Sequence, residues 1–450
     1  MSESTGTCPL ICRTPDEPMF RLHGGTVKAG AFLCAAHQTA DALRSGRYVL
    51  NLCRDRLPFA LALAAAVLRG QVTLLSGARS PEWLEALSER FPGVYAVADY
   101  PAPPGQRFPW HLLDPSSIRL TGRRGANPNF PAAQLACIVF TSGTTGQPLA
   151  HRKSWGALVE RSIDAAAWLE LAKARTTSIV GMVPPHHMYG FETTVLLPLH
   201  TPVATWCGPA FYPQDVVAAL RSVPAPRVLV TTPLQIRTLL HASIDLPPIE
   251  RVVSATAPLF PDMAQAAEKR WKTRVVEIFG ATEVGSIAGR HTVGGDVWTT
   301  YPRVRLHQAS PDAETLASGP HAEAYPLSDI IEMLDDRHFR LVGRRLDVIK
   351  LGGRRASLAE LNRILAGLDG VIDGQFVAPD DLDRRPTARL LVFVVAPERS
   401  AEDLLAELRH RIDPLFLPRR IIKVDMLPRN DVGKLTHQAL GALRAQISET

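Results

Sequence analysis

The chain has 450 residues, of which 46% are hydrophobic, and it carries a formal net charge of +6. This length exceeds the usual limit of one domain and the apolar share is ample for a large core, so two globular domains are expected. The positive charges are spread without long like-charged runs, which favours small anions or an acidic partner and speaks against dedicated nucleic-acid binding.

The sequence shows no signal for export or for membrane insertion. Residues 1–5 (Met-Ser-Glu-Ser-Thr) contain no basic segment followed by an apolar core. The longest apolar run, residues 59–68, is too short to span a bilayer and predicts a buried helix. The six cysteines form neither a C-x-x-C pair nor a zinc spacing with histidine, which predicts reduced thiols. We therefore expect a cytoplasmic protein without a membrane role.

Residues 46–98 alternate short apolar runs with helical patterns. The runs at 48–52 and 72–75 predict strands, and the segments after Pro58 and at 81–90 predict helices. This alternation is typical of an α/β unit with a parallel sheet.

A strand predicted at residues 138–140 leads into a loop of glycines and small hydroxylated residues. Gly143 and Gly146 permit backbone conformations that other residues avoid, and they let main-chain N–H groups approach a polyanion closely. The loop lacks the Walker lysine, which speaks against an ordinary P-loop kinase. Alone, the tract fits a surface linker as well as a phosphate cradle. Its hydroxyl donors are Thr141, Ser142, Thr144 and Thr145.

The alternation continues after the loop. Helices are expected after Pro213, Pro233 and Pro261, because proline suits the first turn of a helix. The predicted strands of this part are at residues 178–182, 227–231, 251–254 and 274–278.

The last quarter of the chain has a different pattern. Strands at 390–395 and 421–424 and a helix at 401–412 predict a compact α+β unit of ordinary domain size. We predict an α/β fold with a large N-terminal domain of packed sheets and helices at residues 1–345 and a small C-terminal domain at residues 346–450.

Further segments follow the loop in a fixed order. Together with it they resemble the AMP-forming adenylating superfamily of acyl- and aryl-CoA synthetases, luciferases and peptide-synthetase adenylation domains. The resemblance covers the chain from about residue 135 to 440, and it implies a mobile C-terminal domain, ATP and Mg²⁺. The segments are 184–191 (Pro-Pro-His-His-Met-Tyr-Gly-Phe), 254–259, 279–283 (Phe-Gly-Ala-Thr-Glu), 327–329, 343–353 and 428–435.

The resemblance assigns roles in the large domain. His187 is expected between the acid pocket and the nucleotide, although a lone histidine is more often a core residue. Thr256 lies in the turn that meets adenine, where the family commonly has glycine. Phe279, followed by Gly280, is expected to stack on adenine, because a flat ring suits a purine.

Two neighbouring residues of the same segment are expected to act on the triphosphate. The resemblance places Thr282 on a phosphate and Glu283 on magnesium, a role that suits a hard carboxylate. Alone, Glu283 fits a carboxylate at a helix start equally well.

The remaining roles fall in the last third of the chain. By resemblance, Asp329 binds the ribose hydroxyls, Arg344 reaches the ribose or a phosphate, and Lys434 is the catalytic lysine. Gly352 and Gly353 lie on the face that admits pantetheine after the small domain rotates. Alone, a lysine after glycine indicates only a solvated turn.

Two further positions depart from the family pattern. Leu149 replaces the lysine that usually ends the phosphate loop, with Arg152 and Lys153 nearby as substitutes. Leu346 replaces the usual aspartate or lysine of the interdomain hinge. The first departure is expected to affect the contacts with pyrophosphate, and the second the rotation of the small domain.

The chain is shorter than typical members and looks most like compact ligases that attach a 4-hydroxybenzoate starter to an acyl carrier protein in bacterial aryl-polyene (xanthomonadin-type) pigment pathways. We hypothesise that function, with the acid pocket near His187, Tyr189, Thr256 and Gly280. One alternative is an aryl- or acyl-CoA synthetase that uses free coenzyme A. The other is a non-catalytic adenylate-binding protein, since the loop lysine and the hinge residue are missing.

Overall fold

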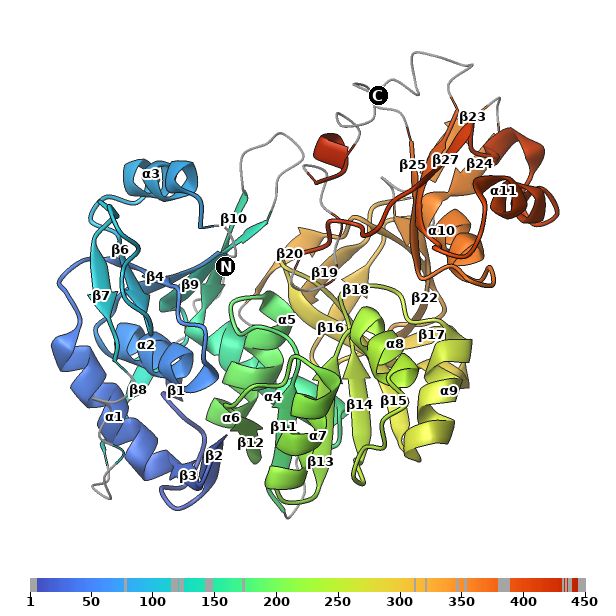
Figure 1. The fold of residues 1–450 in the computed structure, drawn as a ribbon. Coiled ribbons are helices and arrows are strands. Elements are labelled where there is room, and N and C mark those ends of the chain that lie inside the picture. The colour runs from blue at the N-terminus through green and yellow to red at the C-terminus, as the bar shows by residue number, and fades with distance from the viewer. Residues whose placement is uncertain are drawn as a thin grey trace. The chain divides into compact units, whose positions relative to one another are not determined.

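The computed structural model divides into two compact units, shown in Figure 1. The large unit comprises residues 1–307, 316–325 and 336–338, and the small unit comprises residues 308–315, 326–335 and 339–450. For Thr141, Ala322, Glu323, Arg344, Val348, Lys350 and Arg355 the structure describes the backbone alone. The residues that it describes are 6–76, 79–114, 120, 125–141, 149–171, 175–310, 313–319, 322–344, 348–351, 354–378, 389–430, 433, 435 and 439–443.

The first sheet of the large unit has the strand order β10-β9-β5-β4-β6-β7. Its strands pair in parallel except for β10, which is antiparallel to β9. A parallel sheet with interspersed helices confirms the α/β organisation predicted for residues 46–98. The strands are β4 (Tyr48–Asn51), β5 (Val72–Leu75), β6 (Tyr95–Ala98), β7 (Trp110–Leu112), β9 (Leu135–Thr141) and β10 (Leu149–Ser154).

Helix α2 (Arg56–Leu68) is the apolar run of the sequence, and all its residues up to Val67 are buried. It packs against helix α1 (Ala29–Ala42), and both belong to one apolar core. Helix α3 (Pro81–Arg90) begins at a proline, and the hydroxyl of Ser80 accepts a hydrogen bond from the amide of Trp83 as its N-cap. The buried helix and the helix at 81–90 are therefore confirmed.

The second sheet of the large unit contains the order β17-β16-β15-β14-β13-β11-β12-β2-β3. The strands from β2 to β15 pair in parallel, while β3, β16 and β17 add antiparallel edges. The strands are β2 (Pro18–Leu22), β3 (Gly25–Lys28), β11 (Thr177–Gly181), β12 (Val203–Trp206), β13 (Arg227–Thr231), β14 (Arg251–Ser254), β15 (Arg274–Ala281), β16 (Gly285–His291) and β17 (Val297–Thr300).

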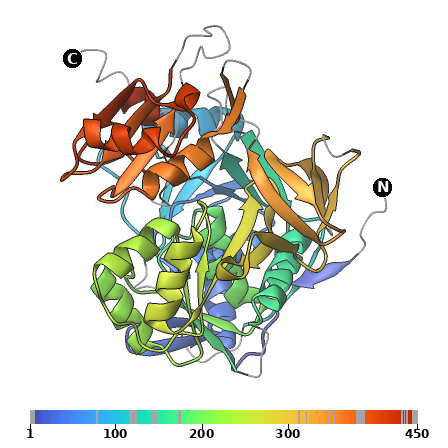
Figure 2. The same cartoon turned by 90° about the vertical axis from the view of Figure 1, so that its right-hand side faces the viewer.

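Helices cover both faces of this sheet. The helices α7 (Pro213–Ser222), α8 (Pro233–His241) and α9 (Pro261–Trp271) share one core with β13–β15, and each begins at its predicted proline. Figure 2 shows them on one side and α4 (Trp155–Trp168) on the other. On the side of α4 the chain also forms α5 (Met188–Phe191), the π-helix η2 (Glu192–Leu196) and α6 (Leu197–His200).

Short elements complete the large unit. Strand β1 (Thr7–Pro9) pairs with β8 (Asn129–Pro131), and a 3₁₀ turn, η3 (Thr292–Gly294), follows β16. A small sheet has the order β18-β19-β20. Its strands are β18 (Arg305–His307), β19 (Leu316–Gly319) and β20 (Ala322–Pro326), of which the last ends in the small unit.

The small unit contains the antiparallel pairs β21–β22 and β23–β24 and the sheet β25-β26-β27. Helices α10 and α11 pack against that sheet over one apolar core. The predicted helix at 401–412 is three residues shorter, because α11 ends at Arg409 and buried Ile412 follows in a turn. The elements are β21 (Asp329–Met333), β22 (His338–Arg344), β23 (Val348–Leu351), β24 (Arg354–Ser357), α10 (Leu358–Ala366), β25 (Asp373–Val377), β26 (Leu391–Val395), α11 (Ala401–Arg409), η5 (Pro414–Phe416) and β27 (Arg420–Lys423).

Within the described residues, every helix is too short or too polar to cross a membrane. The six cysteines are all described and are free thiols.

Candidate functional site

Several predicted site residues lie outside the described part of the chain. Their assigned roles stay predictions. They are Ser142, Gly143, Thr144, Thr145, Gly146, Gly352, Gly353 and Lys434, together with the hinge residue Leu346.

The described candidates of the large unit follow the carboxyl ends of strands. His187 comes after β11, Thr256 after β14, and residues 282 and 283 after β15. Strands β11, β13, β14 and β15 are parallel neighbours, so their carboxyl ends meet at one edge of the second sheet. This edge is where open α/β sheets bind ligands. Thr141 likewise lies at the carboxyl end of a strand, as the last residue of β9 in the first sheet.

A tight hairpin presents Thr282 and Glu283 at this edge. Gly280 pairs with Ser286 and Ala281 with Gly285, which leaves residues 282–284 as the turn between β15 and β16. A side chain at Gly280 would collide with the main chain of Gly285. Gly285 has a φ of +79°, a conformation that glycine adopts without strain. Both candidate side chains are half-buried.

A lysine of the first sheet forms a hydrogen bond with the main chain of this turn. The Nζ of Lys153, on β10, donates a hydrogen bond to the main-chain carbonyl of Glu283. Lys153 is buried, and burial lowers its pKa to about 8 despite the opposing charges of Glu192 and Glu283. The main-chain carbonyl of Glu283 thus accepts a hydrogen bond from Lys153. The side-chain carboxylate of Glu283 is an oxygen ligand of the kind that suits Mg²⁺.

A buried glutamate forms hydrogen bonds with Ser286, which follows the turn. Glu192 begins the π-helix η2, and its carboxylate accepts hydrogen bonds from the Ser286 amide at 3.1 Å and from the Ser286 hydroxyl. An added Cβ at Gly285 would lie 2.5 Å from its Oε1. Burial raises the pKa of Glu192, and the hydrogen bonds from Ser286 and the charge of Arg161 oppose that rise. Isolated π-helical turns occur frequently at functional sites.

Phe279 precedes the turn and is mostly covered. The residue is 8% exposed, and its ring lies 5.7 Å from the ring of Trp298, centroid to centroid. The aromatic residue predicted to stack on adenine is therefore largely covered by the protein.

Thr256 occupies a backbone conformation that threonine rarely adopts. Its φ is +81°, and β-branched residues at positive φ are strained. The family's usual glycine would adopt this φ freely, which gives a physical reason for that preference. The turn is fixed further on by a 2.9 Å hydrogen bond from the Leu259 amide to the carboxylate of Glu277.

His187 directly precedes α5 and has an extended backbone. Its carbonyl accepts the Phe191 amide at 2.7 Å, and its amide donates to the Pro184 carbonyl at 3.3 Å. A Cβ at Gly190 would collide with that same Pro184 carbonyl. The absence of a side chain at Gly190 therefore allows α5 to approach the main chain of Pro184 closely.

The small unit brings two further candidates together. Asp329 and Arg344 are direct partners across the antiparallel strands β21 and β22. Asp329 is 7% exposed. Their predicted roles, on the ribose hydroxyls and on the ribose or a phosphate, both concern the nucleotide.

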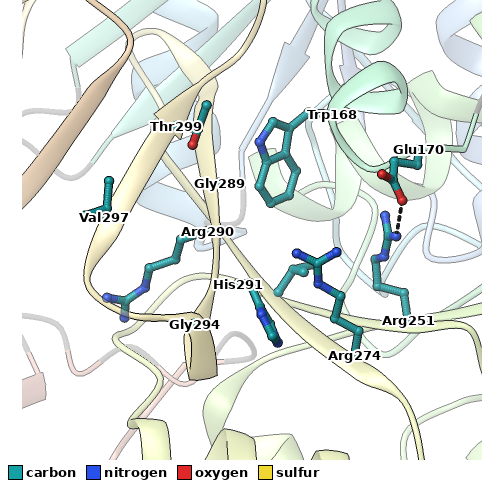
Figure 3. A pocket seen from close by; sticks show the side chains of 11 residues that line it. Trp168, Glu170, Arg251, Arg274, Gly289, Arg290, His291, Gly294, Val297 and Thr299 are labelled. Atoms are coloured by element: carbon teal, nitrogen blue, oxygen red, sulfur yellow. Dashed lines mark hydrogen bonds and ion pairs between the residues drawn. The ribbon is translucent and has the colours of Figure 1, made fainter. Parts of the chain in front are cut away.

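The sequence did not indicate a basic pocket at the opposite edge of the second sheet (Figure 3). It has a volume of about 320 Å³, and Arg251 and Arg274 line it at the amino ends of β14 and β15. Two of its three arginines have acidic partners, Arg251 with Glu170 at 2.8 Å and Arg290 with Glu277 at 2.5 Å, and the Nε2 of His291 lies 2.8 Å from a carboxylate oxygen of Glu268.

Comparison with solved structures confirms the predicted fold, a large N-terminal and a smaller C-terminal domain. ATP-bound MatB from Rhodopseudomonas palustris superimposes with a TM-score of 0.81 and 18% identity over 96% of this chain and 97% of that one. The O-succinylbenzoate coenzyme A synthetase from Bacillus subtilis, with ATP and magnesium ion, gives 0.79 and 17% over 97% and 100%.

Two curated relatives are 4-coumarate–CoA ligases. That of Halorhodospira halophila is 28% identical over 66% of this chain and 73% of its own length. That of Rhodobacter capsulatus is 28% identical over 62% of this chain and 69% of its own. The model of the family described as AMP-binding enzyme matches residues 19–314. These comparisons confirm the predicted enzyme class, an AMP-forming acid–thiol ligase that uses ATP and Mg²⁺. The chain belongs to the AMP-binding enzyme family.

Proposed function

We propose that the chain activates an aryl carboxylic acid, with 4-hydroxybenzoate as the first candidate, and transfers it to the phosphopantetheine thiol of an acyl carrier protein. The observation that carries the proposal is the grouping of His187, Thr256 and the 282–284 turn after the carboxyl ends of neighbouring strands. This edge can hold an acid and a nucleotide side by side.

The first half-reaction makes the acid reactive. A carboxylate acylates thiols poorly because its oxygen is a poor leaving group, and a mixed anhydride with AMP solves this. Thr282 would contact a phosphate and Glu283 would hold Mg²⁺, which neutralises phosphate charge when bound. The loop at 141–146 would hold the outer phosphates, and Lys434 would stabilise the charge that develops on the α-phosphate. This is positioning and electrostatic catalysis.

Nucleotide selection would involve the paired residues of the small unit. Asp329 is proposed to accept the ribose hydroxyls, and its cross-strand partner Arg344 to reach the ribose or a phosphate. A carboxylate that accepts both hydroxyls would select a ribonucleotide over its 2′-deoxy analogue, because the analogue lacks one of the two hydroxyl donors. Comparing ATP with 2′-deoxy-ATP tests this assignment.

The acceptor thiol has two candidates. In the second half-reaction the thiol attacks the acyl adenylate on the face that carries Gly352 and Gly353. The carrier protein is our first choice because of the resemblance to ligases that load an acyl carrier protein. The curated relatives are named as CoA ligases, which supports free coenzyme A as the second candidate. Thioester yields with coenzyme A and with holo carrier protein, measured by mass spectrometry, distinguish the two.

The acid is proposed to lie near His187, Tyr189, Thr256 and Gly280. An aromatic acid is supported by the names of the 4-coumarate–CoA ligases. A flat apolar slot with one polar group would recognise the hydroxyl of 4-hydroxybenzoate. Turnover of a fatty acid without turnover of 4-hydroxybenzoate would refute this choice.

A non-catalytic adenylate-binding protein is the alternative from another class. Leu149 and Leu346 in place of charged family residues favour it. The chain retains Thr282, Glu283, Asp329, Arg344 and Lys434, the groups that phosphoryl transfer needs, which favours an enzyme. The pigment pathway, the cytoplasmic location and the domain boundary between residues 345 and 346 stay predictions.

A further inference from the structure

We propose that Lys153 is a positioning residue for adenylation, which holds the 282–284 turn through the main-chain carbonyl of Glu283 while Glu192 holds the turn from its other end. The inference rests on the proposed function, because its consequence for catalysis depends on Thr282 and Glu283 acting on ATP. It assigns Lys153 a role other than that of a substitute for the missing loop lysine.

The strand geometry separates Lys153 from the missing loop lysine. Residues 149, 151 and 153 share one face of β10, since side chains alternate along a strand. Four residues of strand span roughly 13 Å, so Leu149 and Lys153 occupy different places on that face. Arg152 points to the opposite face and is exposed. Lys153 therefore acts at the turn rather than at the position of the loop lysine.

The surroundings of Lys153 are strongly charged for a buried site. Glu192 on η2 and Glu283 in the turn act on its ammonium with negative charge, and Arg161 on α4 acts with positive charge. Cys137 on β9 and His151 on β10 are the other titratable groups that interact with it. Burying such charges costs free energy that an apolar residue would not, so a buried lysine here indicates a positional role.

The two buried charges hold the turn on both sides. Lys153 donates to the carbonyl of Glu283, and Glu192 accepts from the amide and hydroxyl of Ser286. Between these two anchors the hairpin has only Val284 and Gly285. The side chains of Thr282 and Glu283 are thereby presented from a fixed backbone, which is the preorganisation that electrostatic catalysis requires. Misplacement by about 1 Å at such a site costs on the order of a hundredfold in rate.

The test compares Lys153→Met with Lys269→Met, a change at an exposed lysine of helix α9. Acid-dependent ATP–pyrophosphate exchange gives kcat and KM for ATP, and hydrogen–deuterium exchange of the full-length protein reports the amides of residues 282–286. We expect Lys153→Met to lower kcat by roughly tenfold to a hundredfold with a smaller change in KM. The hairpin amides should exchange faster, while Lys269→Met leaves both readings at the parent values.

Two further variants complete the test. Glu192→Gln keeps the shape of the second anchor and should also speed hairpin exchange, and Lys153→Arg should restore part of kcat because it retains a cationic donor. Parent kcat and parent amide exchange in Lys153→Met would overturn the inference. If the parent protein shows no exchange with any acid, the proposed function fails, and amide exchange alone then decides whether Lys153 holds the turn.

Discussion

The hydroxyl of Tyr189 donates a 2.9 Å hydrogen bond to the main-chain carbonyl of Val253. Tyr189 is buried in α5, and burial raises the pKa of its phenol, so it remains a protonated donor. The bond joins the segment that carries His187 to the strand that leads into the Thr256 turn. The two parts of the proposed acid and adenine site are therefore held together by one side chain.

Tyr189→Phe removes this connection without leaving a cavity. We expect a loss of about 1 kcal/mol in the free energy of unfolding and a raised KM for the acid, because the two segments lose their shared hydrogen bond. Chemical denaturation and exchange kinetics measure the two effects. The exposed Tyr212→Phe is the matched control and should change neither quantity. An unchanged KM for Tyr189→Phe would show that the acid does not contact this region.

Thr256→Gly should relieve the strain of a β-branched residue at positive φ. We expect a gain of about 1 kcal/mol or more in unfolding free energy. Thr256→Ala retains a Cβ and should recover less of this gain. Denaturant titration of both variants provides the comparison, and equal stabilisation by alanine and glycine would contradict the explanation.

Lys434→Ala should nearly abolish adenylate formation while ATP binding stays largely intact. The proposed contact of this lysine is made mainly in the transition state, so its loss affects kcat rather than affinity. Isothermal titration with ATP and single-turnover formation of acyl-AMP separate the two quantities. Equal loss of ATP affinity would contradict the assignment.

Leu149→Lys tests the departure at the end of the phosphate loop. Leu149 is 54% exposed at the start of β10, so a lysine fits there without burial. We expect a lower KM for pyrophosphate in the exchange reaction, because the new cation contacts the leaving group. Leu112→Lys, at another exposed leucine, is the control. No change in the KM would indicate that a nearby cation such as Arg152 already supplies the charge.

His200 predicts a pH dependence of stability that is independent of catalysis. It is fully buried, its Nδ1 lies 3.1 Å from the Ser162 hydroxyl, and burial lowers its pKa to about 3. The unfolded chain binds a proton near the ordinary pKa of about 6.5, whereas the folded chain does not until much lower pH. The stability that the neutral ring contributes is therefore fully present above the unfolded-state pKa of about 6.5. It falls as the pH decreases towards the folded-state pKa of about 3.

The corresponding experiment is denaturation of the parent and of His200→Gln at pH 7.5 and pH 5. Lowering the pH should destabilise the parent by about 2 kcal/mol more than the variant, since only the parent must keep a buried ring unprotonated. His241→Gln, at an exposed histidine, should retain the parent's dependence. Parallel pH curves for parent and His200→Gln would refute the assignment.

Much of the fold was predictable because local patterns and packing agree. Strand β13 and the helices α7, α8 and α9 begin where the apolar runs and prolines predicted. Strand β15 extends three residues beyond the prediction, to Ala281. Its last residues pair with β16 in a glycine-dependent hairpin, so their extended conformation depends on pairing with the following strand rather than on local propensity.

The site was predictable by motif and less so by chemistry. Thr282 and Glu283 were found from their segment, but Glu192 and Ser286, which fix the turn, were not. A glutamate directly after Phe191, in the otherwise uncharged run of residues 188–199, was the available signal, since a charge in a buried helix needs a partner. The partner could not be identified from the sequence, because Glu192 and Ser286 are 94 residues apart.

The most direct measurement is acid-dependent ATP–pyrophosphate exchange across hydroxybenzoates, other aryl acids and fatty acids. The account predicts exchange that requires an acid and Mg²⁺ and that is fastest with an aryl acid, 4-hydroxybenzoate first. Silence across the whole panel, in a protein that still binds ATP, would contradict the proposed ligase and favour a non-catalytic adenylate-binding protein.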